Sequence, residues 1–349
     1  MSPAPLTLNA LISVCLLCWS TWGIFDKKAL EAARHIDVLI FQHLFYVLEV
    51  PLIFLLLGFL YPQGWSISLP VWGWTLLGSG SSSLAMLFYL VAMSRAEASF
   101  VLGITAAYPM VVQVFAFFML HEALVPERVL GSLLIGLGVA FIGSSAEKGA
   151  EKSEEKPEAL PLNGSQAVED SEYAKQEIPL VNVPPVSLLR QERLARVEAG
   201  RKRKNKTQVL ALCCLATLAW GMTGLFDKKA LLIDAPFKVY FARCAWDAII
   251  LAAMLAGAYL MKQKIQWRAP RAWKYSIFSS LCLSLGTIAY MFAMTMASAS
   301  YIIVITGCYP LFMYLFAILF LKEKLRKARL IGVLLVVGGG LLVQETQGV

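Results

Sequence analysis

The hexapeptide FDKKAL occupies residues 25–30 and recurs at residues 226–231. Each copy follows a run of apolar residues, so an aspartate and two lysines stand twice at the end of a hydrophobic segment. The two copies begin 201 residues apart. Internal repeats change the interpretation of every other pattern, so the rest of the chain is compared at the same offset first.

The offset of 201 residues aligns the two halves of the chain without a gap. Identical residues meet at widely separated positions: Trp19 with Trp220, Gly23 with Gly224, Tyr89 with Tyr290, Tyr108-Pro109 with Tyr309-Pro310, Glu122 with Glu323 and Gly131 with Gly332. A register kept over this length indicates a duplicated structural unit. It predicts a first repeat at 1–145, a second at 207–349 and a linker at 146–206.

The composition identifies the class of protein. Hydrophobic residues make up 58% of the chain and charged residues 15%, with a mean hydropathy of +0.65, whereas soluble domains carry about 25% charged residues. The chain is therefore predicted to be a multi-pass integral membrane protein in contact with membrane lipids, in the plasma membrane or an endomembrane. Its net charge of +8 lies largely in short loops, where positive charge sets topology, which argues against a nucleic-acid partner.

No cofactor and no metal site are expected. The seven cysteines all lie inside apolar segments, where a free cysteine behaves as a small hydrophobic residue. Cys15 and Cys18 have CxxC spacing, but no second pair or neighbouring histidine accompanies them. They are predicted to pack against other helices and not to bind metal.

Ten segments are long and apolar enough to cross a bilayer as helices, because about 20 residues span its roughly 30 Å hydrocarbon core. They lie at 6–25, 38–60, 70–93, 98–120, 128–145, 207–226, 238–260, 273–295, 299–321 and 328–343. The predicted fold class is an all-α membrane protein of ten transmembrane helices. Five helices per repeat is an odd number, so the second copy must enter the bilayer from the opposite side. Two inverted five-helix repeats are typical of transporters with a site near the midplane.

Several motifs carry a resemblance to a known family. The first predicted helix combines Trp-Gly with an aromatic residue and Lys-Ala-Leu, the fourth contains a proline, and Glu122 precedes the Gly-rich stretch in HEALVPERVLGSLLIGLGVAFIG. The second half offers KEKLRKARLIGVLLVVGGGLLV. Together they resemble the EamA-type transporters of the drug/metabolite transporter superfamily, over nearly everything except the linker. The resemblance implies translocation of a small molecule, among substrates that include amino acids, nucleotide sugars, phosphorylated metabolites and drugs.

The linker at 146–206 replaces apolar runs with Glu, Lys, Pro, Ser and Asn, a composition that predicts disorder. It ends in RKRKNK, which is either a topology signal or a contact with anionic lipid headgroups. Between the predicted helices, fourteen Lys and Arg residues fall on the linker side and four on the side of both termini. The positive-inside rule therefore places the linker in the cytoplasm and both termini outside or in a lumen, whereas the resemblance implies cytoplasmic termini.

Three charged residues lie inside predicted helices and away from their ends, namely Glu49, Arg243 and Asp247. A charge at the bilayer centre costs about 2.5 to 3.5 kcal/mol, so a retained one suggests function. Gln42, Tyr46 and Glu49 share one helix face, and the offset places Arg243 on Gln42 and Asp247 on Tyr46. Both stripes are predicted to line one substrate-binding cavity. Glu49 or Asp247 would carry a coupled proton and Arg243 would meet an anionic substrate group; alternatively, Arg243 forms a structural ion pair with Asp247 or Glu49.

Other candidates follow from the repeats. The residues of the hexapeptides are candidate gates at the two cavity mouths, or lysines that snorkel outward: Asp26, Lys27, Lys28, Asp227, Lys228 and Lys229. Prolines in the middle of predicted helices indicate kinks, which makes Tyr108 and Tyr309 candidates to line the cavity. Trp19, Trp22 and Trp220 are candidates to stack on a substrate, or to pack between helices.

These patterns predict a secondary transporter of a small polar or amphipathic metabolite that works by alternating access. An enzyme is not expected, because the sequence has neither an HExxH nor a GxSxG motif and only three histidines. The alternative is a scaffold or sensor that recruits partners through the linker and tolerates replacement of Glu49 and Arg243.

Overall fold

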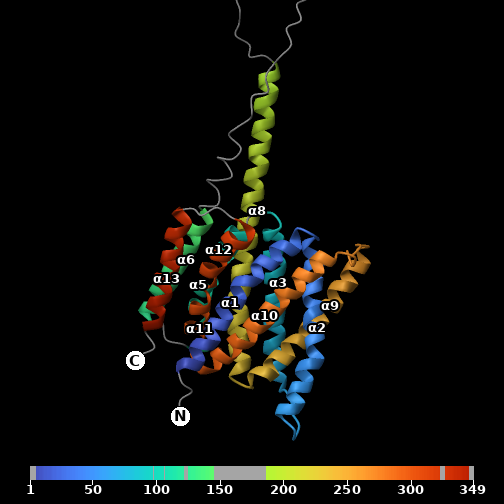
Figure 1. Ribbon diagram of the computed structural model, residues 1–349, viewed down its shortest axis with the longest axis vertical. Coiled ribbons are helices and arrows are strands. Elements are labelled where there is room, and N and C mark those ends of the chain that lie inside the picture. The colour runs from blue at the N-terminus through green and yellow to red at the C-terminus, as the bar shows by residue number, and fades with distance from the viewer. Residues whose placement is uncertain are drawn as a thin grey trace, which may run out of the picture.

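The computed structural model describes the backbone of residues 5–96, 98–105, 107–121, 125–144, 186–322 and 327–345. All regular secondary structure in these ranges is helical (Figure 1). The helices of the first half are α1 (Pro5–Leu30), α2 (His35–Leu60), α3 (Leu69–Met93), α4 (Ala98–Thr105), α5 (Tyr108–Leu120) and α6 (Pro126–Ser144). Those of the second half are α8 (Val186–Leu231), α9 (Pro236–Leu260), α10 (Pro270–Met296), α11 (Ala299–Thr306), α12 (Tyr309–Leu321) and α13 (Lys327–Glu345).

Seven helical segments within these ranges are long and apolar enough to cross a membrane. They are Thr7–Leu30, His35–Leu60, Leu69–Met93, Thr207–Leu231, Pro236–Leu260, Pro270–Met296 and Ala299–Leu321. The all-α membrane prediction is confirmed by them. The other three predicted spans, at 98–120, 128–145 and 328–343, coincide with helices α4 to α6 and α13.

The fourth and ninth predicted spans are broken where a kink was expected. In the first repeat α4 ends at Thr105 and α5 begins at Tyr108, with Pro109 in its first turn. The second repeat has the same break between α11 and α12. Proline has no N–H to donate and disfavours helical backbone in the residue before it. Each proline therefore starts a new helix instead of bending an existing one.

The linker differs from its prediction in one part. Residues 186–206, predicted to be disordered, form the first half of α8 and run directly into its apolar half. Leu, Arg, Ala, Glu and Lys dominate this stretch, and all are strong helix formers. Residues 145–185 lie outside the described residues, as do Glu122 and Glu323 of the repeat alignment.

The two repeats pack against each other through equivalent helices. Helix α1 lies on α10, and its counterpart α8 lies on α3. Helices α2 and α9 pair with each other, as do α6 and α13. In Figure 1 the start of α1 and the end of α13 lie at the lower end, while the charged half of α8 rises from the upper end. A central space therefore lies between helices of both repeats.

Glycines bring α6 and α13 into close contact. A Cβ atom added at Gly138 would lie 2.4 Å from the Gly332 carbonyl oxygen, and one at Gly339 would lie 2.5 Å from the Gly131 carbonyl oxygen. The repeat offset exchanges these two contacts, so they form one reciprocal pair. Gly339 thus makes a close contact between the two helices, whereas Gly338 faces open space.

Candidate functional site: a polar cavity between the repeats

A cavity of about 130 Å³ lies among α1, α2, α3, α8, α9 and α10. Tyrosines at the starts of α5 and α12 complete its wall. Of the residues predicted from the sequence to bind substrate or couple, the following line it: Trp19, Gln42, Tyr46, Tyr108, Trp220, Arg243, Asp247 and Tyr309. The two polar stripes meet at one cavity, because α2 and α9 pack against each other.

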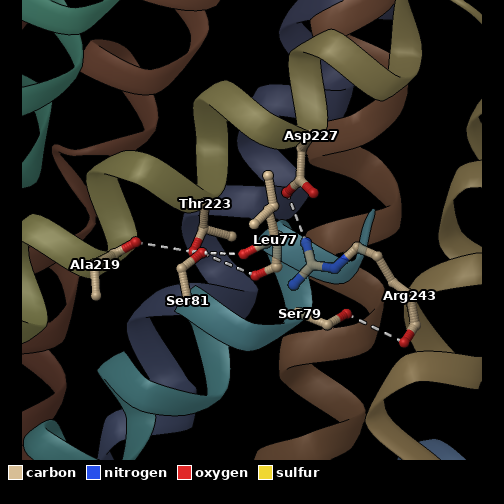
Figure 2. Close-up of polar contacts among 8 residues, drawn as sticks. Leu77, Ser79, Ser81, Ala219, Thr223, Asp227 and Arg243 are labelled. Carbon is tan, nitrogen blue, oxygen red and sulfur yellow. Dashed lines mark hydrogen bonds and ion pairs between the residues drawn. The ribbon is translucent and has the colours of Figure 1, made fainter. Parts of the chain in front are cut away.

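Arg243 forms an ion pair with Asp227 and not with Asp247 or Glu49, the partners anticipated from the sequence. Its Nη1 donates to Asp227 Oδ2 over 2.6 Å. Figure 2 shows Arg243 of α9 reaching Asp227 on α8, while Ser79 of α3 donates to the Arg243 carbonyl oxygen over 3.2 Å. Asp227 is 1% exposed and Arg243 12%. An ion pair at Arg243 is therefore present, but its partner is not one of the two that were expected. The partner, Asp227, lies on α8 and was not identified from the spacing of residues along α9.

The equivalent place in the first repeat holds a different pair. Gln42 Nε2 donates to Asp26 Oδ1 over 2.6 Å, and Ser279 Oγ donates to the same oxygen over 2.5 Å. Asp26 is fully buried. Gln42 lines the cavity, and Asp26 lies behind it. The aspartates of the two hexapeptides are therefore both buried, Asp227 in the cavity wall and Asp26 behind it.

Glu49 does not line the cavity itself, but it is hydrogen-bonded to two residues that do. Its Oε2 accepts hydrogen bonds from the Tyr240 hydroxyl at 2.6 Å and from Ser284 Oγ at 3.0 Å. Both donors line the cavity. Glu49 thus reaches the cavity through two hydroxyl groups contributed by the second repeat.

Asp247 lines the cavity directly and is 8% exposed. It interacts electrostatically with His43 and Arg243. His43 is held by the Leu39 carbonyl oxygen at 3.0 Å and by Ser83 Oγ at 2.9 Å. His43 lines the cavity wall as well.

The lysines of the hexapeptides bind the ends of helices. Lys27 Nζ donates to the carbonyl oxygens of Met93 and Ala96, both over 2.9 Å. Lys228 Nζ does the same to Met294 and Ala297, over 2.5 and 3.0 Å. Cations stabilise the unsatisfied carbonyls at a helix C-terminus, so these lysines cap α3 and α10.

Lys28 lies over an aromatic ring instead: its Nζ is 5.6 Å from the ring centroid of Tyr275 on α10. Its counterpart Lys229 is half-buried. Neither lysine lines the cavity. Of the six candidate gate residues, Asp227 alone belongs to the cavity wall in this conformation.

Aromatic rings cover a large part of the wall, and the two repeats arrange them alike. Trp19 packs on Tyr290 with ring centroids 5.2 Å apart, and Trp220 packs on Tyr89 at 5.3 Å. Trp22 joins the second set, because its ring centroid lies 4.8 Å from that of Tyr89 and it meets Trp220 edge-on at 5.7 Å. The tryptophans therefore pack between helices and also present ring surface to the cavity.

Sequence reasoning missed further wall residues, among them Ser83, Tyr240, Ser284 and Tyr290. The repeat offset contains a signal for three of these, because it aligns Ser83 with Ser284 and Tyr89 with Tyr290 as identical pairs. Tyr240 has no identical counterpart and carries no such signal. Among the described residues there is no group of three His, Cys, Asp or Glu side chains that could hold a metal ion.

Comparison with known proteins identifies a family that matches both halves of the chain. Residues 7–144 and 207–344 each match the EamA-like transporter family. The chain is also 30% identical over 146 residues to the riboflavin transporter ImpX of Fusobacterium nucleatum subsp. nucleatum, a match that covers 38% of this chain and 46% of that relative. The match thus spans less than half of the relative's length. A solved structure described only as the crystal structure of a protein superposes with a TM-score of 0.64 at 14% identity, covering 98% of both chains, which shows the fold alone.

Proposed function

Because the chain belongs to the EamA-like transporter family, we propose that it is a secondary transporter that moves a small polar or amphipathic metabolite by alternating access. The cavity is the observation that supports this proposal. Equivalent helices of two repeats enclose it, and its wall combines tryptophan and tyrosine rings with Arg243 and Asp247. Two similar units around a central polar site are the arrangement that rocking transporters use.

The proposal includes ten membrane crossings in two inverted repeats, at 1–145 and 207–349, joined by the linker. In its support, α1 and the apolar half of α8 run in opposite directions in Figure 1. The reciprocal packing of α1 on α10 and of α8 on α3 also fits a twofold axis between the repeats. Motion of one repeat against the other would open the cavity to each side in turn.

The wall favours a substrate with a flat ring and polar substituents. Trp19, Trp22 and Trp220 offer ring faces and edges, and hydroxyl groups from α3 and α10 offer hydrogen bonds. Riboflavin, which the bacterial relative is named for, has this character and is one compound to test. The substrate contacts would come from Gln42, Tyr46, Arg243 and Asp247.

The driving force is proposed to be a proton gradient. Asp247 stands in the wall, and Glu49 is joined to the wall by Tyr240 and Ser284. A carboxylate that gains and loses a proton as the cavity changes sides would couple the two fluxes. Arg243, held by Asp227, keeps one positive charge at the cavity and would orient an anionic substrate group.

Flux in proteoliposomes tests the proposal. Uptake and efflux of a metabolite panel that includes riboflavin are measured with and without a pH gradient, for the wild type, Glu49→Gln, Asp247→Asn and Arg243→Ala. We expect gradient-dependent flux of one compound and at least a tenfold loss in Asp247→Asn. Asp234→Asn is the matched control, because Asp234 lies in the loop before α9, where it pairs with Lys238 in the first turn of that helix.

The second candidate function is the scaffold that recruits partners through the linker. Its discriminating result is the absence of flux of any compound, together with cavity variants that behave as the wild type in every assay. The long charged half of α8, which projects from the helical bundle in Figure 1, is the feature that favours it. Deletion of residues 146–200 would abolish a recruiting function and leave transport intact.

A further inference from the structure

Two aspartates at equivalent positions of the repeats are buried to the same degree. Asp26 is 0% exposed and Asp227 1%, and the offset of 201 residues places one on the other. Their partners differ. Asp227 meets the guanidinium of Arg243, whereas Asp26 meets the amide of Gln42, which occupies the same position in its own repeat.

A second substitution separates the two sites. Ser279 donates a hydrogen bond to Asp26 Oδ1 over 2.5 Å. The residue equivalent to Ser279 is Gly78, where an added Cβ would lie 3.0 Å from Asp227 Oδ1. The second repeat thus compensates its aspartate with a positive charge, and the first surrounds its aspartate with neutral donors.

The other groups around Asp26 are also neutral at physiological pH. Titratable side chains that interact with it are Tyr46 of α2, Tyr89 of α3 and Cys282 of α10. Lys27, next in the chain, donates instead to the carbonyls at the end of α3. Within the described part of the chain, no Lys, Arg or His forms an ion pair with Asp26.

Three polar atoms of this cluster are buried without a hydrogen-bond partner, namely Asp26 Oδ2, Gln42 Oε1 and the Tyr89 hydroxyl. The carboxylate and amide oxygens are acceptors, and the tyrosine hydroxyl supplies a single proton for the two of them. An ionised carboxylate buried without a counter-ion is costly enough that such a group takes up a proton instead. A proton on Asp26 removes the charge and adds a second donor to this cluster.

We infer that Asp26 is a proton-binding site, neutral in this conformation, and that Gln42 and Ser279 hold it in place of the cation used by the second repeat. The site is occluded, because Asp26 lies behind Gln42 and does not line the cavity. Binding adds H⁺ to a carboxylate oxygen, and release returns it to water. Release requires α2 or α10 to move and uncover Asp26.

The role of this proton in coupling rests on the proposed transport function, whereas the protonation of Asp26 does not. The first experiment therefore reads the proton directly. Infrared spectra of the purified full chain are compared between the wild type, Asp26→Asn and the matched control Asp227→Asn, in H₂O and D₂O. We expect Asp26→Asn to remove a slowly exchanging carbonyl band of a protonated carboxylic acid, and Asp227→Asn to retain it. A band unchanged by Asp26→Asn overturns the inference.

A second variant covers the case in which Asp26→Asn does not fold. Gln42→Arg with Ser279→Gly gives Asp26 the partners of Asp227, and we expect the same band to vanish because the guanidinium now neutralises the carboxylate. Persistence of the band in that variant contradicts the inference.

Flux then separates the two claims. If the wild type transports with a pH gradient, Asp26→Asn is expected to retain exchange at equal pH and to lose at least tenfold of its gradient-driven accumulation. Full gradient-driven accumulation in Asp26→Asn excludes Asp26 as the coupling site. Absence of wild-type flux removes the proposed function while the infrared result still decides the protonation of Asp26.

Discussion

At the scale of single residues, the two repeats solve the same problem in different ways. A carboxylate ends the apolar part of α1 and of α8, and it must be neutralised where water is absent. The second repeat neutralises the carboxylate with the guanidinium of Arg243, whereas the first surrounds it with the neutral donors Gln42 and Ser279, and the inferred proton removes its charge. The duplication thus left one site with a fixed positive charge and the other with none, which provides two chemically distinct positions at one cavity.

Removal of the fixed charge is expected to destabilise the protein. Arg243→Gln leaves Asp227 buried and unpaired, and breaking a buried pair costs about 3–5 kcal/mol. The double variant Arg243→Gln with Asp227→Asn leaves no charge behind and is expected to regain most of that loss. Thermal unfolding in detergent measures both. Equal melting temperatures for the wild type and Arg243→Gln would contradict a structural ion pair.

At the scale of elements, the helices are held by contacts that repeat across the pseudo-twofold axis. Lys27 and Lys228 cap α3 and α10 in the same way. Gly138 and Gly339 allow the backbones of α6 and α13 to touch. The first lysine of each hexapeptide thus caps the end of a helix, which gives one reason why charged residues recur where each apolar segment finishes.

Neighbouring glycines of α13 test the packing. Gly339→Ala places a methyl group 2.5 Å from the Gly131 carbonyl oxygen, so the helices must separate, at a cost of about 1–3 kcal/mol. Gly338→Ala meets nothing within 4 Å and is expected to be neutral or to stabilise by about 0.5–1 kcal/mol, since alanine favours helix. Detergent melting curves of the two variants provide the comparison. A similar change in both would show that α13 does not pack as described.

At the scale of the whole molecule, the charged half of α8 lies at one end of the helical bundle, and the start of α1 and the end of α13 lie at the other (Figure 1). The odd number of crossings proposed for each repeat would produce this arrangement. The excess of Lys and Arg on the linker side further predicts that the linker faces the cytoplasm.

Epitope tags test this topology. A tag inserted after residue 160 is expected to be stained only in permeabilised cells, and a tag after Val349 without permeabilisation if the protein resides in the plasma membrane. In an endomembrane, selective permeabilisation of the plasma membrane should expose the linker tag alone. Tags on the same side would contradict ten crossings, and exchanged sides would contradict the charge rule.

The sequence by itself determined the class of the protein, its duplication, its apolar helices and several residues of the cavity wall. Those features depend on properties read along the chain: hydrophobic length, an exact offset between copies, and polar residues on one face of a helix. For this reason Gln42, Tyr46, Arg243 and Asp247 were identified before their contacts were known.

Only the tertiary structure decided which groups neutralise one another. Asp227 pairs with Arg243 from a different helix, Ser279 reaches Asp26 across the repeats, and Glu49 stands behind Tyr240. The breaks at Pro109 and the helical start of α8 also departed from expectation. Such pairings join residues as far as 253 positions apart, and they depend on how helices cross. In a membrane interior each partner changes the charge that a carboxyl group can carry, so the roles of Asp26 and Asp227 follow from packing and not from the hexapeptide that they share.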